Sequence, residues 1–261
     1  MTDDSRETAA SSTERRGNDF DGPAIQDRRK VTAALVVAMT VTAMEQLVVS
    51  PAMPTIIAEL KGFDIYPWVI SANLLAATVS TPVYGKLADI FGRRPVLLAG
   101  MGLFSLGSLL SGMATSMPQL IAMRALQGLG AGAVGPIVLT MLGDLFTLEE
   151  RARVQGLFSA VWGISSVAGP TIGGWLTDHA GWRWVFLVSL PFAALASWMI
   201  VRYYHEPMVK RRTAPIDWAG ALLLTAGLST FLYVVLDGPR HGWAFDGAFL
   251  AFSMVLLAAF V

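Results

Sequence analysis

The sequence predicts an all-α protein that crosses a membrane several times. Of its 261 residues, 54% are hydrophobic and only 15% are charged, and the mean hydropathy is +0.55. A soluble protein of this length rarely combines so few charges with so many apolar residues. The apolar residues also come in stretches of about 20, the length that a helix needs to cross the hydrocarbon layer. Because lipid offers backbone polar groups no partner, we expect these stretches to be helices.

Eight stretches have this character, and residues 1–30 precede them. The expected spans are 31–52, 66–87, 95–115, 117–143, 153–177, 183–202, 217–236 and 245–261. Residues 1–30 are polar, mixed in charge and lack the apolar core of a signal peptide, so we expect a disordered tail. The last span runs to Val261 without a polar flank. This favours the N-terminal part of a longer protein, with a natural truncation as the alternative.

Lysines and arginines predict the orientation of these helices. If the N-terminus is inside, the tail and the connections on its side of the membrane hold 15 of the 19 bases, and the connections on the other side hold 3. Positive residues collect on the cytoplasmic side of a membrane. We therefore expect a multi-pass protein of the cell membrane with a cytoplasmic N-terminus.

A charged segment at residues 85–95 separates the second and third spans. It combines two glycines, one acid and three bases. We expect Gly85 and Gly92 to let two helix ends approach closely, and Asp89 to give bases such as Arg93 and Arg94 a fixed partner. The segment resembles the loop between helices 2 and 3 of the major facilitator superfamily, written Gly-x-x-x-Asp-x-x-Gly-Arg. The alternative is a charged turn that only sets the topology.

This resemblance implies a fold and a role for the charged segment. Residues 31–202 would form a six-helix bundle of two inverted three-helix repeats. A basic cytoplasmic loop at 203–216 and two further helices at 217–261 would follow. The segment at 217–223 resembles the start of the extra helix in 14-helix drug:proton antiporters, although in a 12-helix carrier the same helices would begin the second half. Gly85, Asp89, Gly92, Arg93 and Arg94 would control conformational gating.

Two ionisable residues fall inside the spans. Glu45 lies about 14 residues into the first span and Arg124 lies in the fourth, at compatible depths. A charge at mid-membrane costs roughly 2.5–3.5 kcal/mol on insertion scales, so it usually faces a partner or a cavity. Such a pair either only locks two helices together or lets Glu45 exchange a proton while Arg124 adjusts its affinity. The run from Arg124 through Gln127 to Gly132 resembles the family motif Arg-x-x-Gln-Gly-x-Gly-Ala, in which the arginine is linked to proton transfer.

The fifth span carries small residues around a proline. Small residues four apart let helices pack closely, and a proline frees a backbone carbonyl and kinks its helix. The pattern resembles the superfamily's antiporter motif, Gly-x8-Gly-x3-Gly-Pro-x2-Gly-Gly, with a serine at one of the six fixed positions. Those positions are Gly156, Ser165, Gly169, Pro170, Gly173 and Gly174. The alternative is an ordinary Gly- and Pro-rich membrane helix, whereas the motif implies export of a substrate in exchange for protons.

The function implied is multidrug:H+ antiport, the proton-coupled efflux of amphipathic or cationic organic compounds by alternating access. Glu45 would carry the proton with Arg124 as its partner, and Gln46, Asn73 and Gln127 would line the substrate cavity. The proton gradient would drive transport without a cofactor. The partners would be protons, a small lipophilic or cationic substrate, the bilayer, and further C-terminal helices. The alternatives are a truncated or inactive half-transporter, and an importer or uniporter of another small solute.

Composition argues against other classes of protein. The formal net charge is zero, which disfavours nucleic acid as a partner. The chain has no cysteine and only three scattered histidines, so a metal site is not expected. No nucleophile–base pair and no Walker loop is evident, so we do not expect an enzyme.

Overall fold

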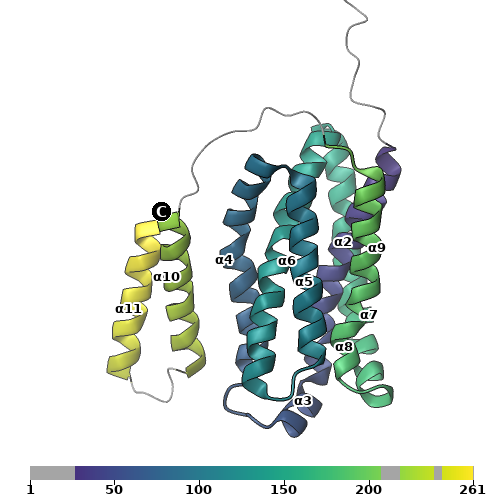
Figure 1. Ribbon diagram of the computed structural model, residues 1–261. Coiled ribbons are helices and arrows are strands. Elements are labelled where there is room, and N and C mark those ends of the chain that lie inside the picture. The colour runs from purple at the N-terminus through teal and green to yellow at the C-terminus, as the bar shows by residue number, and fades with distance from the viewer. Residues whose placement is uncertain (1–26, 207–217, 238–242, 261) are drawn as a thin grey trace, which may run out of the picture.

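A computed structural model describes residues 27–206, 218–237 and 243–260, and within these ranges every regular element is a helix. In Figure 1 the helices stand side by side as long rods. Their bounds are α2 (Arg28–Val48), η1 (Ser50–Ala52), α3 (Met53–Leu60), α4 (Pro67–Phe91), α5 (Arg93–Gly112), α6 (Met117–Leu145), α7 (Leu148–His179), α8 (Arg183–Leu187), α9 (Ser189–Tyr203), α10 (Trp218–Asp237) and α11 (Trp243–Phe260).

The helices from α2 to α9 form one bundle. Helix α6 packs between α4 and α5, and α2 packs against α7 and α9. Helices α10 and α11 form a hairpin that lies beside α4 (Figure 1). We refer to the two ends of the bundle by a residue that lies at each of them, Gly92 at one end and Trp182 at the other.

The first helix differs at both ends from the expected span of 31–52. Residues 28–30, expected in the tail, are helical because Asp27 caps α2 and its carboxylate accepts a hydrogen bond from the Lys30 amide at 3.4 Å. Helix α2 stops at Val48, just before Pro51, which has no N–H to continue the hydrogen-bond ladder. After the short η1 turn, α3 extends the rod to Leu60. The rest of the expected tail, residues 1–26, lies outside the described residues.

The charged segment at 85–95 is not a loop, which corrects the sequence-based expectation. Helix α4 continues to Phe91 and α5 begins at Arg93, so Gly92 alone connects them. Gly92 has φ of +101°, in the region that favours glycine, and a Cβ there would lie 2.5–2.7 Å from the Glu206 carboxylate. Gly85 has no atom within 4 Å of its Cβ position, so it does not serve close packing within the described residues.

The sixth span is split, and the connection after it begins later than expected. Helices α8 and α9 meet at Val188. Tyr203, expected in the basic loop at 203–216, is the last residue of α9. The basic stretch 210–212 and the start of the expected seventh span at residue 217 lie outside the described residues.

Four described segments are long and apolar enough to cross a membrane, judged by length and composition. They are Arg28–Leu60, Arg93–Gly112, Met117–Leu145 and Arg183–Tyr203. Helices α4 and α7 are also long, with 25 and 32 residues, but serine, threonine, glycine and proline lower their mean hydropathy. Helices α10 and α11 contain the shorter apolar stretches Leu222–Val235 and Gly247–Leu256. The architecture is that of an all-α, multi-pass membrane protein.

Two apolar clusters form the core of the bundle. The cluster nearer Gly92 includes Val41 of α2 and Ala133 of α6, and the cluster nearer Trp182 includes Val48 of α2 and Leu120 of α6. On α2 the residues between Val41 and Val48, and on α6 the residues between Leu120 and Ala133, lie between the two clusters. The ionisable residues inside the bundle lie in these stretches, so they are sealed from both ends by apolar side chains.

Candidate functional site

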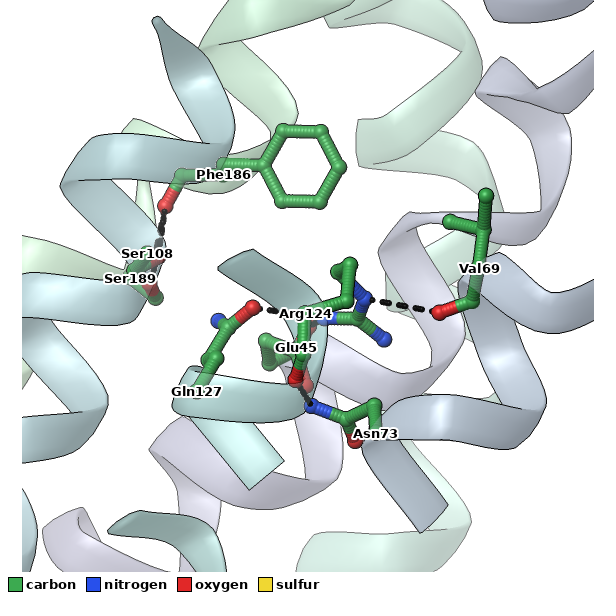
Figure 2. A network of polar contacts seen from close by, with 8 residues as sticks. All are labelled: Glu45, Val69, Asn73, Ser108, Arg124, Gln127, Phe186 and Ser189. Carbon is green, nitrogen blue, oxygen red and sulfur yellow. Dashed lines mark hydrogen bonds and ion pairs between the residues drawn. The ribbon is translucent and has the colours of Figure 1, made fainter. Parts of the chain in front are cut away.

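Glu45 and Arg124 form a buried ion pair at the centre of the bundle. Arg124 Nη1 donates to Glu45 Oε1, which joins α6 to α2 (Figure 2). Glu45 is 3% exposed and Arg124 is 2% exposed. Taking two charges out of water is costly, so a buried pair is stable only if further hydrogen bonds satisfy its polar atoms. The neighbours of Arg124 supply such bonds.

Three polar contacts fix Arg124 besides the ion pair. Its Nη1 also donates to Gln127 Oε1 at 2.7 Å, and its Nε donates to the Val69 carbonyl at 3.2 Å. The Asn73 side chain donates to the Arg124 carbonyl at 3.2 Å (Figure 2). Helices α2, α4 and α6 therefore meet at one guanidinium. The buried Nε2 of Gln127 has no hydrogen-bond partner among the described residues.

Two glycines let neighbouring helices approach α6 closely: Gly128 of α6 lies against α4, and Gly107 of α5 lies against α6. A Cβ on Gly128 would overlap the Asn73 backbone, and a Cβ on Gly107 would lie 2.5–2.7 Å from Gln127. Glycine at these two positions allows the backbones to touch. The close packing fixes the Asn73 and Gln127 side chains against Arg124.

A narrow crevice beside Glu45 opens between α2 and the α8–α9 pair. Its walls are almost entirely apolar, and Ser189 is the one uncharged polar residue among them. The lining residues are Val41, Met44, Glu45, Val48, Val185, Val188, Ser189 and Phe192. Ser189 shares a hydrogen bond of 3.0 Å with Ser108 of α5.

The three expected cavity residues do not share one environment. Asn73 and Gln127 are buried and belong to the Arg124 network. Gln46 follows Glu45 on α2 but is exposed, because successive helical residues point about 100° apart. The structure therefore does not place Gln46 beside the ion pair.

The expected gating residues lie at the Gly92 end of the bundle. Arg93 Nε forms an ion pair of 2.8 Å with Asp144 of α6, and the Arg93 amide donates to Glu206 at 2.5 Å. Arg94 donates to the Val201 carbonyl at 2.5 Å. Asp89 is exposed and has no partner among the described residues. The acid that pairs with Arg93 is therefore Asp144, not Asp89 as expected, and Arg94 has a backbone carbonyl as its partner.

Sequence reasoning missed Asp144, Glu206 and Tyr204 as members of this cluster. Tyr204 is fully buried in this cluster, and its hydroxyl has no hydrogen-bond partner among the described residues. Burial raises the pKa of this hydroxyl. The pairing across helices leaves no local pattern in the sequence.

The residues of the antiporter pattern divide between two faces of α7. Ser165, Gly169 and Gly173 are buried, and the two glycines face Leu47 and Val48 of α2. A Cβ on Gly169 would lie 2.7 Å from Leu47 Cβ, and one on Gly173 would overlap the Val48 carbonyl. The remaining positions are exposed or half-buried, and they are Gly156, Pro170 and Gly174. Small residues thus bring α7 against the part of α2 that follows Glu45.

Comparison with known families supports the resemblance that the motifs suggest. A model described as Major Facilitator Superfamily matches residues 35–261. Multidrug resistance protein 3 of Bacillus subtilis (strain 168) is 38% identical over 235 residues, which cover 88% of this chain and 46% of that protein. Multidrug transporter protein MdtP of the same organism is 37% identical over 240 residues, which cover 90% of this chain and 44% of that protein.

A fungal relative and a solved structure extend the comparison. Efflux pump dotC of Dothistroma septosporum (strain NZE10 / CBS 128990) is 37% identical over 239 residues, which cover 88% of this chain and 41% of that pump. The chain thus spans less than half the length of these curated relatives. The crystal structure of the human organic anion transporter MFSD10 (TETRAN) has a TM-score of 0.62 and 18% identity, covering 78% of this chain and 55% of that one. At this identity the likeness concerns the fold.

Proposed function

Because the chain belongs to the Major Facilitator Superfamily, we propose that it is the N-terminal part of a proton-coupled exporter of amphipathic or cationic organic compounds. The printed names of three relatives, a multidrug resistance protein, a multidrug transporter and an efflux pump, support efflux of small molecules. These relatives are about twice as long as this chain. The exporter would therefore use further helices that follow the described ones.

The observation that carries this proposal is the burial of Glu45 against Arg124. A carboxylate inside an apolar bundle can bind and release a proton, whereas arginine stays charged. With Glu45 ionised, the pair is neutral. With Glu45 protonated, the site gains one positive charge, because Arg124 keeps its own. Proton binding therefore changes the charge of the bundle's centre, and this change can be coupled to a conformational state.

Coupling follows from thermodynamic linkage. If the protonated site favours one face of the alternating-access cycle and the substrate favours the other, each ligand weakens the binding of the other. The proton gradient then drives export without a cofactor. A cationic substrate is favoured when Glu45 is ionised, because the site then carries one positive charge fewer. Gly169 and Gly173 seal α7 against the segment of α2 that carries Glu45.

The location and orientation proposed follow from charge. The bases collect on the connections that share a side with the N-terminus, so this side and the Gly92 end would be cytoplasmic. Arg93, Arg94 and Asp144 would then tie helix ends together on the cytoplasmic face. The proposed location is the cell membrane.

The test uses membrane vesicles that carry the full-length protein and are energised with a proton gradient. Addition of a cationic dye should release protons in the wild type, and Glu45→Gln should abolish the release. The matched control is Glu149→Gln, the same change at an exposed carboxylate in the first turn of α7. Release that persists in Glu45→Gln would move the coupling site elsewhere. Absence of release in the wild type would favour an importer, a uniporter or an inactive protein.

A further inference from the structure

The face of an aromatic ring lies near the guanidinium of Arg124. The Arg124 Cζ is 5.8 Å from the ring centroid of Phe186, and Figure 2 shows this ring on the side of Arg124 opposite Asn73. Phe186 is fully buried and comes from α8. A cation within about 6 Å of a ring centroid is attracted by the electrons of the ring, and most strongly where water is excluded.

The backbone of Phe186 is held in place by two buried serines. Its carbonyl accepts a hydrogen bond of 2.7 Å from Ser108 of α5 and one of 2.9 Å from Ser189 of α9. The two serine hydroxyls also lie 3.0 Å apart. The ring is therefore anchored at its backbone end by contacts with two other helices.

The ring itself is held by Trp182. The two rings meet edge to face, with centroids 6.1 Å apart and planes at 89°. Trp182 is 1% exposed, and its Nε1 donates to Glu59 of α3 at 2.7 Å. Arg183 donates to the same carboxylate at 2.6 Å and lies over the Trp182 ring at 4.4 Å. A continuous series of contacts thus runs from Glu59 through Trp182 and Phe186 to Arg124.

The contact with Phe186 gains importance when Glu45 carries a proton. Arg124 then loses its carboxylate partner but remains charged. The acceptors left to it are Gln127 Oε1, the Val69 carbonyl and the face of the Phe186 ring. Of these, only the ring comes from α8, a helix that packs mainly against α5 and α7.

We propose that Phe186 is a positioning residue for proton coupling, because its ring holds the Arg124 guanidinium in place while Glu45 is protonated. This inference rests on the proposed function. The Trp182–Glu59 contact fixes the ring and so ties the ion pair to the Trp182 end of the bundle. The proton moves only between Glu45 and water, and Arg124 remains protonated throughout.

The test measures protons released per dye molecule transported, in vesicles that carry the full-length protein. This ratio does not depend on how much folded protein is present. Phe186→Leu should lower it by roughly 2- to 30-fold, the range that corresponds to one cation–π contact. Phe186→Tyr keeps the ring face and should keep the ratio. The matched control is Phe104→Leu, the same change at a ring of α5 that is 1% exposed and belongs to the apolar cluster nearer Gly92.

Fluorination of the Phe186 ring separates the effect of its electrons on Arg124 from the effect of its shape on packing. Trifluorophenylalanine in place of Phe186 keeps the ring but withdraws electrons from its face, so the ratio should fall although packing is preserved. An unchanged ratio in the fluorinated protein, or equal ratios for Phe186→Leu and Phe104→Leu, would overturn the inference. Glu45→Gln serves as the reference. If Glu45→Gln keeps full proton release, the assignment of proton coupling to Glu45 fails. The inference alone fails if Glu45→Gln loses proton release while the Phe186 variants keep the wild-type ratio.

Discussion

Gly128→Ala tests the close packing of α4 against α6, on which the Arg124 network depends. A Cβ at this position would overlap the carbonyl oxygen of Asn73 and would lie 2.9 Å from both its Cα and its carbonyl carbon. Ordinary contacts of a Cβ begin near 3.4 Å, so the two helices must separate by at least about 0.5 Å. The neighbour is backbone, which cannot swing aside as a flexible side chain could.

The loss of stability follows from the hydrogen bonds that join α4 to α6 beside this contact. The bonds from Asn73 to the Arg124 carbonyl and from Arg124 to the Val69 carbonyl are both 3.2 Å long. A separation of about 0.5 Å stretches them to about 3.7 Å, beyond the range of a hydrogen bond. Two interhelical bonds at about 0.6 kcal/mol each, added to about 1–3 kcal/mol for overpacking, give a loss of roughly 2–4 kcal/mol in the free energy of unfolding.

The assay is unfolding of the purified protein in mild detergent by titration with sodium dodecyl sulfate. The control is Gly135→Ala on the same helix, where no atom lies within 4 Å of the Cβ position. There alanine should leave the free energy of unfolding unchanged or raise it by up to about 1 kcal/mol, because alanine favours helix. Equal unfolding midpoints for the two variants would refute the reasoning that α4 and α6 are held at backbone contact.

The other predictions concern the Gly92 end of the bundle and the packing of α7. Tyr204→Phe should raise the free energy of unfolding by about 1–2 kcal/mol at neutral pH, because it removes a buried hydroxyl without a described partner. Burial raises the pKa of Tyr204, so the folded state retains its proton longer than the unfolded state; stability should fall above the unfolded pKa of about 10, and a titration should show a smaller fall in Tyr204→Phe. Gly173→Ala should cost about 1–3 kcal/mol by forcing α7 from α2, whereas Gly174→Ala, with open space at its Cβ, should not; identical unfolding curves would contradict this. Asp89→Asn should leave stability within about 0.5 kcal/mol but slow dye efflux, and Arg93→Ala should lower stability by about 1–3 kcal/mol through loss of its ion pair; normal efflux in Asp89→Asn would count against a gating role.

The ion pair was the part of the site that sequence reasoning could reach. Two ionisable residues in otherwise apolar stretches must find partners, and counting residues along each helix gave Glu45 and Arg124 similar depths. The structure joins them directly. The acid partner of Arg93 was assigned wrongly because Asp89 is near in sequence, whereas Asp144 is brought to Arg93 by the packing of α5 on α6. Proximity along the chain does not give the direction in which a helical side chain points.

The contacts of Phe186 had no sequence pattern to reveal them. That Phe186 faces Arg124, and that Trp182 meets Glu59, depends on the angles at which α3, α6 and α8 pack. An aromatic residue at a helix end is equally suited to a membrane interface, to the core or to a cation.

The sequence by itself determined that this chain is helical and membrane-spanning, and it identified the residues around which a transport site could form. The length of the apolar stretches, the charge asymmetry and the glycine and proline patterns are local properties of the sequence. Every apolar stretch in lipid must satisfy its own backbone hydrogen bonds, so each forms a helix. Only the tertiary structure decided that the segment at 85–95 is a helix end joined at Gly92 and that Gln46 points away from the ion pair. Those outcomes depend on the rotation of each helix about its axis. This rotation is set by close packing between neighbours, which local composition does not specify.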